Sequence, residues 1–238
     1  MARDAQERLI VALDFDRLAP AVQMARRLAG LAGMFKIGKQ LFTAEGPRAV
    51  ERLARLGIGI FLDLKFHDIP NTVAGAIRAA AELPGVRLVN VHALGGKAMM
   101  RAAAQAVAGK KKRPKVIGVT LLTSMDEDAL WKVGILGPPL KRAVHLARMA
   151  KLAGLDGVVA SPQEVAEIRR VCGEKFLTVV PGIRPAASTR DDQSRIATPG
   201  EAILGGADYL VVGRPITAAE DPRAAAKQIL EEMSAALA

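Results

Sequence analysis

Three charged residues stand close together at the end of a very hydrophobic segment, "IFLDLKFHDIPNTV", residues 60–73. Read as a β-strand, it places Asp63 and Lys65 on one face and only apolar residues on the other, and Asp68 follows the strand. Buried charges are costly unless they are paired. This group could carry out acid–base or electrostatic chemistry, or it could be an ion-pair network that closes the end of a sheet.

The elements that must position these charges alternate between strand-like and helix-like segments. Glycine repeatedly closes a helix before a strand, as at Gly33, Gly57 and Gly154. Eight strands, each followed by a helix, predict one (β/α)₈ TIM barrel domain of the α/β class over residues 1–238. An open doubly wound sheet is the alternative, but the first strand ends "LDFDRLAP", without a Gly-rich turn. The predicted strands are 8–15, 34–38, 58–66, 86–94, 115–122, 156–161, 176–183 and 208–215.

A barrel would bring the unusual groups of this sequence to one end. Asp14 ends the first strand, Lys36 lies in the second, and Arg184 and Arg214 follow the seventh and eighth. The C-terminal ends of barrel strands carry the active site. The basic run 110–115 precedes a strand and is therefore predicted at the opposite end. Long loops after the fifth and seventh strands are candidate lids.

Several polar residues in this region also have structural interpretations. Asp68 could cap the helix that begins at "DIPNTV", and Thr72 could be an ordinary threonine of its first turn. His67 is expected to have a structural or supporting role, and His92, at the end of the fourth strand, is left unassigned.

Composition narrows the class of protein. Half of the 238 residues are hydrophobic and 3% are aromatic, which suits amphipathic helices around a sheet. No segment resembles a signal peptide or is long and apolar enough to span a bilayer. The single cysteine, Cys172, excludes an internal disulfide and is expected to be a small buried side chain. We therefore expect a soluble cytoplasmic protein that does not interact with membranes.

The net charge of +10 favours anionic partners. A nucleic-acid-binding protein is one interpretation, but the densest cluster, "KKKRPK", has no interleaved aromatic residues on which bases could stack. We expect no specific nucleic-acid partner and at most weak, non-specific binding.

Residues 61–73, "FLDLKFHDIPNTV", resemble the D-x-K-x-x-D signature of the orotidine 5′-phosphate decarboxylase family. The resemblance implies a barrel that converts orotidine 5′-phosphate to uridine 5′-phosphate and CO₂, the last step of pyrimidine nucleotide synthesis, without a metal or organic cofactor. Further segments resemble motifs of that family, in the family's order, along nearly the whole chain: "VALDF", "FKIG", "VTLLTS", "PGIRP", "DDQSR" and "VVGRPI".

The resemblance also implies roles for matching residues. Lys65 would protonate C6 of the pyrimidine, and Asp63 would lie near the substrate carboxylate. Lys36 and Asp68 would complete the catalytic group, with Asp68 supplied by the second subunit of a homodimer. The other positions would bind substrate: Asp14 and Lys36 at the ribose, Thr72 at the ribose across the dimer interface, Thr123 and Ser124 at the pyrimidine, and Arg184, Gln193, Gly213 and Arg214 at the phosphate.

Two other functions remain as alternatives. Magnesium-dependent sugar-phosphate decarboxylases and aldolases of the same barrel group share D-x-K-x-x-D, but typically have a metal-binding glutamate where this chain has Lys36. A lysine there would repel magnesium. An inactive barrel kept as an interaction scaffold is disfavoured by the complete set of charges.

Overall fold

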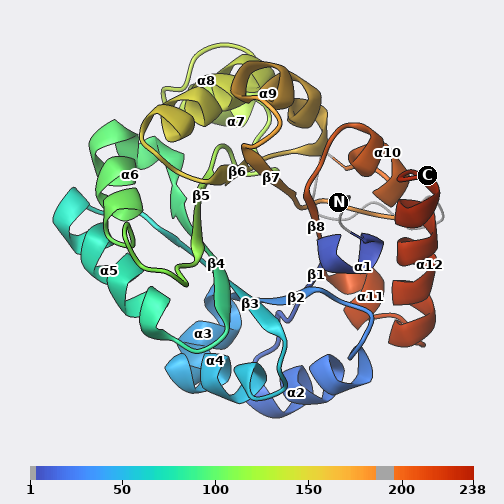
Figure 1. The fold of residues 1–238 in the computed structure, drawn as a ribbon. Coiled ribbons are helices and arrows are strands. Elements are labelled where there is room, and N and C mark those ends of the chain that lie inside the picture. Colours follow the sequence, from blue (N-terminus) through green and yellow to red (C-terminus); the bar gives the residue numbers. More distant parts are fainter. Residues whose placement is uncertain (1–3, 186–195) are drawn as a thin grey trace.

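The computed structural model describes residues 4–185 and 196–238. Eight parallel strands pair in sequence order, and β8 pairs with β1, so the sheet closes into a barrel. Helices surround the strands as an outer ring (Figure 1). The predicted (β/α)₈ architecture is confirmed. The strands are β1 (Leu9–Ala12), β2 (Met34–Gly38), β3 (Gly59–Phe66), β4 (Val86–His92), β5 (Lys115–Val119), β6 (Gly157–Val159), β7 (Leu177–Val180) and β8 (Tyr209–Val212).

The outer ring contains more helices than one per strand. β2 is followed by two α-helices, with Gly46 between them at φ 62°, and β5 and β8 are each followed by two α-helices as well. A short 3₁₀ helix, labelled η, precedes the α-helix after β4 and after β6. The helices are α1 (Ala5–Arg8), α2 (Leu18–Arg27), α3 (Lys39–Glu45), α4 (Pro47–Ala54), α5 (Pro70–Glu82), η1 (Ala93–Gly95), α6 (Gly96–Gln105), α7 (Glu127–Lys132), α8 (Pro139–Leu152), η2 (Pro162–Glu164), α9 (Val165–Cys172), α10 (Pro199–Leu204), α11 (Arg214–Thr217) and α12 (Pro222–Ala235).

Several predicted strands extended too far. The predictions 8–15 and 208–215 shrink to the four-residue strands β1 and β8, because the ladder of hydrogen bonds ends where the chain turns into the loops at the barrel mouth. Gly57 and Gly154 have the positive φ expected at a helix end, but Gly33 does not. A side chain at Gly33 would instead collide with the backbone of Glu7 in α1.

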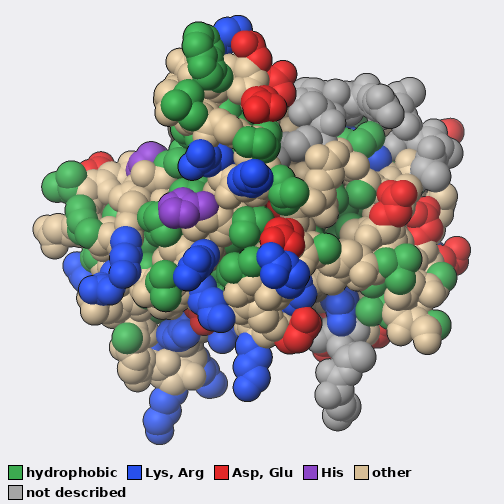
Figure 2. All heavy atoms as spheres, turned by 90° about the horizontal axis from the view of Figure 1, so that it is seen from above, with side chains coloured by type: hydrophobic (Ala, Val, Ile, Leu, Met, Phe, Trp, Pro, Cys, Tyr) green, Lys and Arg blue, Asp and Glu red, His purple; other side chains and the backbone are tan. Residues whose placement is uncertain are grey.

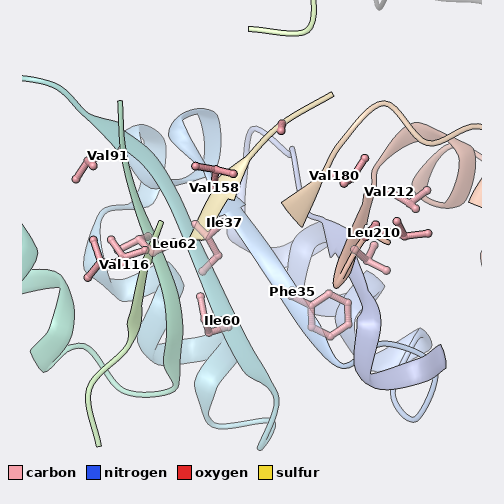
Figure 3. Packing of buried hydrophobic residues seen from close by; sticks show 14 of the residues in the cluster. Phe35, Ile37, Ile60, Leu62, Val91, Val116, Val158, Val180, Leu210 and Val212 are labelled. Atoms are coloured by element: carbon pink, nitrogen blue, oxygen red, sulfur yellow. The ribbon is translucent and has the colours of Figure 1, made fainter. Parts of the chain in front are cut away.

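The core has two layers. A large cluster lies between the strands and helices and includes Phe35, Ile37, Ile60 and Leu62 (Figure 3). A smaller cluster fills the barrel interior and includes Phe61 from β3. The smaller cluster consists of Ile10, Ala12, Met34, Phe61, Leu88, Ile117, Val179 and Val211. Side chains therefore alternate outward and inward along β2 and β3, as the strand pattern predicts.

Arg169 links several segments of the chain at the end of the barrel opposite the mouth. Arg169 in α9 donates to the carbonyls of Phe176 (2.9 Å) and Gly206 (2.6 Å) and to the carboxylate of Asp208 (2.7 Å). Its side chain is only 11% exposed. One guanidinium thus ties the segment after α9 to the starts of β7 and β8.

We expect Arg169→Ala to lower the free energy of unfolding by about 3 kcal/mol, because the substitution leaves the carboxylate of Asp208 without its charged partner. Urea denaturation would measure the change. The neighbouring Arg170→Ala is a matched control, since Arg170 is 72% exposed and pairs with Glu167 on the helix surface. Equal shifts for the two variants would contradict the prediction.

The excess positive charge is concentrated in one part of the chain. Residues 83–155 contain thirteen Lys and Arg against three Asp and Glu. The difference, 13 − 3 = +10, equals the net charge of the whole chain. Lys and Arg side chains gather on the side that Figure 2 shows, where α8 lies in Figure 1.

Within the described residues, no helix is long and apolar enough to cross a membrane.

Candidate active site

The C-terminal ends of the strands surround a cavity of about 480 Å³. A more open hollow of about 1010 Å³, lined by Lys115 and Leu177 among others, lies where the strands begin. In (β/α)₈ barrels that end contributes to stability and not to catalysis. The cavity at the mouth is therefore the candidate site. Eight of the residues with a predicted role line it: Asp14, Lys36, Asp63, Lys65, Thr123, Arg184, Gly213 and Arg214.

Four of these residues form a continuous chain of alternating charges, here called the charge array: Asp14, Lys36, Asp63 and Lys65. The Lys36 ammonium lies 2.8 Å from Asp14 Oδ1 and 3.5 Å from Asp63 Oδ2. The Lys65 ammonium lies 2.7 Å from Asp63 Oδ1. Each carboxylate therefore contacts at least one ammonium group, and the two middle members, Lys36 and Asp63, are buried.

The electrostatics of the charge array keep Asp63 ionised. Burial alone would raise the pKa of its carboxyl, but the charges of Lys36 and Lys65 and the hydrogen bonds from Lys65 and Asn90 outweigh burial and lower this pKa below its ordinary value. Asp63 is thus a fixed negative charge that holds two ammonium groups at the base of the cavity.

Lys65 does not have the regular strand backbone that its sequence suggests. Its φ is 51°, and it is the one non-glycine residue with positive φ in the described part of the chain. The pairing of β3 with β4 shifts register between Leu62 and Phe66. The Lys65 backbone N–H donates to the side-chain oxygen of Asn90, 2.8 Å away. The alternating pleat therefore holds through Asp63 and breaks at the lysine.

Asn90 is a buried polar residue beside the cavity that sequence reasoning missed. It is fully buried in β4, and its Nδ2 donates to Asp63 Oδ1 at 2.6 Å. The available signal was a lone asparagine inside the apolar run "VRLVNVH", because a buried amide needs partners for both its polar ends.

Two histidines lie beside the charge array. The rings of His67 and His92 are stacked, with centroids 5.4 Å apart, and His92 Nδ1 accepts a hydrogen bond from the Leu94 N–H at 3.4 Å. Burial and the charges of His67, Lys65 and Lys39 lower the pKa of His92 to about 4. His92 is therefore neutral at physiological pH. Neither histidine lines the cavity formed by the described residues.

Asp68 and Thr72 lie apart from the other predicted site residues. Both are exposed, and neither lines the cavity within the described chain. The Asp68 carboxylate accepts a hydrogen bond from the adjacent Ile69 N–H at 2.6 Å. Asp68 is not a helix cap, because α5 begins at Pro70 with Ile69 in the cap position and no side-chain capping bond.

The lining of the cavity differs from the prediction at other positions. Ser124 is exposed and lies outside the lining that the described residues form, and Gln193 lies outside the described residues. Gln40 and Leu122 line the cavity but were not predicted. Gln40 donates to Asp16 at 2.6 Å. Its position in the first turn of α3, two residues after β2 ends, was the available signal.

Two arginines face the cavity from the ends of neighbouring strands. Arg184 follows β7, is buried, and donates to the Ile183 carbonyl at 3.1 Å. Arg214 begins α11 directly after Gly213 at the end of β8. Guanidinium groups bind phosphate oxygens in bidentate geometry, and phosphate sites of barrels are often built after strands 7 and 8.

A closed parallel barrel with buried charges converging on its mouth defines a (β/α)₈ enzyme. Residues 7–229 match the model of the family described as "Orotidine 5'-phosphate decarboxylase / HUMPS family". The chain belongs to this family.

Curated relatives and solved structures agree with this assignment. The chain is 55% identical to a protein of Syntrophotalea carbinolica named orotidine 5′-phosphate decarboxylase, over 100% of this chain and 99% of that protein. It is also 55% identical to a protein of the same name from Halorhodospira halophila, over 96% and 97%. A crystal structure of orotidine 5′-phosphate decarboxylase from Lactobacillus acidophilus matches 94% of this chain and 98% of its own, with TM-score 0.79 and 40% identity.

Proposed function

We propose that this chain decarboxylates orotidine 5′-phosphate to uridine 5′-phosphate, the last step of pyrimidine nucleotide synthesis, without a metal or organic cofactor. The observation that carries the proposal is the Lys65 ammonium 2.7 Å from Asp63 at the base of the mouth cavity. The names of the full-length relatives support the same substrate and reaction.

In the proposed reaction, the bond between C6 and the carboxylate carbon breaks and its electron pair stays on C6. Carbon dioxide leaves, and the Lys65 ammonium donates a proton to C6. No carbonyl is placed to delocalise the electron pair on C6, so a fixed ammonium nearby would supply the stabilisation and then the proton. Asp63 would hold this ammonium in place through their 2.7 Å ion pair, while Lys36 pairs with the other oxygen of the same carboxylate.

The remaining cavity residues would hold the nucleotide. Asp14 and Lys36 would bind ribose hydroxyls, and Thr123 would contact the pyrimidine with Ser124. Arg214 and the Gly213 backbone would bind the phosphate, together with Arg184 and Gln193. Binding energy from a phosphate remote from C6 can be used to hold the reacting carbon against the ammonium.

Magnesium-dependent members of the family are the second candidate, because the family description also covers HUMPS. In the described residues, no three His, Cys, Asp or Glu side chains come together where they could hold a metal ion. Lys36 occupies the buried position at which those enzymes typically place a metal-binding glutamate. Its ammonium would repel a divalent cation, which favours the cofactor-free reaction.

We further propose that the enzyme acts as a cytoplasmic homodimer, with Asp68 and Thr72 completing the site of the partner subunit. Both residues are exposed on one protomer. Large apolar side chains are also exposed in the segments that follow β3 and β5, including Ile69 (66%), Trp131 in α7 (65%) and Leu136 (59%). Exposed apolar surface of this kind is typical of an interface between protein chains.

Loss of orotidine 5′-phosphate absorbance in the near ultraviolet, followed with excess EDTA, tests the proposed function. We expect conversion to uridine 5′-phosphate at the same rate with and without the chelator, since no step uses a metal ion. Conversion that stops in EDTA and returns with magnesium would favour the metal-dependent chemistry. No conversion by folded protein would overturn the proposed substrate.

A further inference from the structure

Asn90 uses both polar ends of its side chain within the charge array. Its Nδ2 donates to Asp63 Oδ1 at 2.6 Å, and its Oδ1 accepts from the Lys65 backbone N–H at 2.8 Å. A carboxylate only accepts and a backbone N–H only donates, so one orientation of the amide satisfies both partners. Asn90 is fully buried, and water does not compete for these bonds.

The backbone at Lys65 needs such a partner. From Leu62 to Phe66, β3 advances four residues while β4 advances two, from Val89 to Val91. This bulge takes Lys65 out of the regular ladder and into the left-handed region, at φ 51°. A residue with a side chain persists there only when its surroundings hold it. The side-chain oxygen of Asn90 accepts the N–H at this point.

We infer that Asn90 is a positioning residue for the reaction: through two hydrogen bonds it fixes the Asp63 carboxylate and the Lys65 backbone at once, and thereby aims the Lys65 ammonium. Asp63 Oδ1 is the shared atom, because it accepts from both Asn90 Nδ2 and Lys65 Nζ. This inference rests on the roles proposed above for Asp63 and Lys65. Asn90 itself does not line the cavity formed by the described residues, so it acts through these two residues and not on the substrate.

Two substitutions separate positioning from simple stability. Asn90→Ala removes both hydrogen bonds and should lower the single-turnover decarboxylation rate at saturating substrate about 10- to 100-fold, the cost of a catalytic group misplaced by about 1 Å. Asn90→Asp keeps the size of the side chain and an oxygen for the Lys65 N–H, but places a second carboxylate against Asp63. We expect a larger loss of rate for this variant. Affinity for uridine 5′-phosphate, measured by calorimetry, should stay close to wild type, because the phosphate site is untouched.

Thr120→Val is the matched control. Thr120 is a fully buried polar residue of the same barrel, and within the described part of the chain its hydroxyl donates to the Val159 carbonyl at 3.1 Å. It should lose stability and keep the wild-type rate. Asn90 variants that bind uridine 5′-phosphate and keep the rate of Thr120→Val would overturn the inference.

Hydrogen exchange of the Lys65 backbone amide, followed by NMR, gives a readout that does not depend on activity. We expect faster exchange in Asn90→Ala and no change in Thr120→Val, because only the first variant removes the acceptor of this N–H. Unchanged exchange in Asn90→Ala would overturn the inference as well. If the wild-type enzyme does not convert orotidine 5′-phosphate, the proposed function fails, while the exchange result still decides whether Asn90 holds Lys65.

Discussion

Replacing Lys65 by alanine is expected to lower the rate of decarboxylation at least about 10⁴-fold, because in the proposed reaction the substitution removes the general acid and a preorganised positive charge together. Asp63 would keep Lys36 and Asn90 as partners, so the barrel should still fold. Steady-state assay of orotidine 5′-phosphate conversion measures the loss, and calorimetry with uridine 5′-phosphate shows whether the nucleotide site survives.

The control for this variant is Lys97→Ala, which removes an exposed lysine from the outer face of α6. It changes the net charge equally and should leave the rate unchanged. A Lys65→Ala enzyme that binds uridine 5′-phosphate and keeps activity within about tenfold of wild type would assign proton transfer to another group, since one general acid typically contributes at least 10²-fold.

The fold could be predicted from the sequence because local signals agreed with one another. Apolar strands alternated with amphipathic helices, and glycines such as Gly57 and Gly154 marked helix ends with the positive φ that was expected. Strand ends were less predictable, since nothing in "VALDF" shows that pairing stops at Ala12. Gly33 was misread because a close approach of α1 leaves no local pattern in the sequence.

The charged part of the site was predictable for a similar reason. Asp63 lies on the inward face of β3 and Lys36 on the inward face of β2, so a two-residue pleat is enough to bring them together. The conformation of Lys65 was not predictable, because it depends on a bulge against β4. Asn90 lies 25 residues further along the chain, and its contact with Lys65 exists only in the folded barrel.

Asp68 is one of the predicted site residues that a single protomer leaves outside the cavity lining of the described chain, and it motivates the second large effect. Neither Lys65→Ala nor Asp68→Ala homodimers should be active. If Asp68 completes the site of the partner subunit, as proposed, a mixed dimer would contain one site with an intact Lys65 from one subunit and an intact Asp68 from the other. Random exchange makes half of all dimers mixed, and each has one of two sites intact, so about a quarter of wild-type activity should return.

The informative control is a mixture of Lys65→Ala with Lys36→Ala. These two lysines come from adjacent strands of one barrel and belong to the same site, so each site of the mixed dimer lacks one of them. No activity should return, although the subunits exchange equally, which differently tagged subunits would verify by co-purification. Recovery in both mixtures, or in neither, would mean that Asp68 does not act across the interface. Recovery only with Asp68→Ala would explain why this carboxylate is exposed on a single protomer.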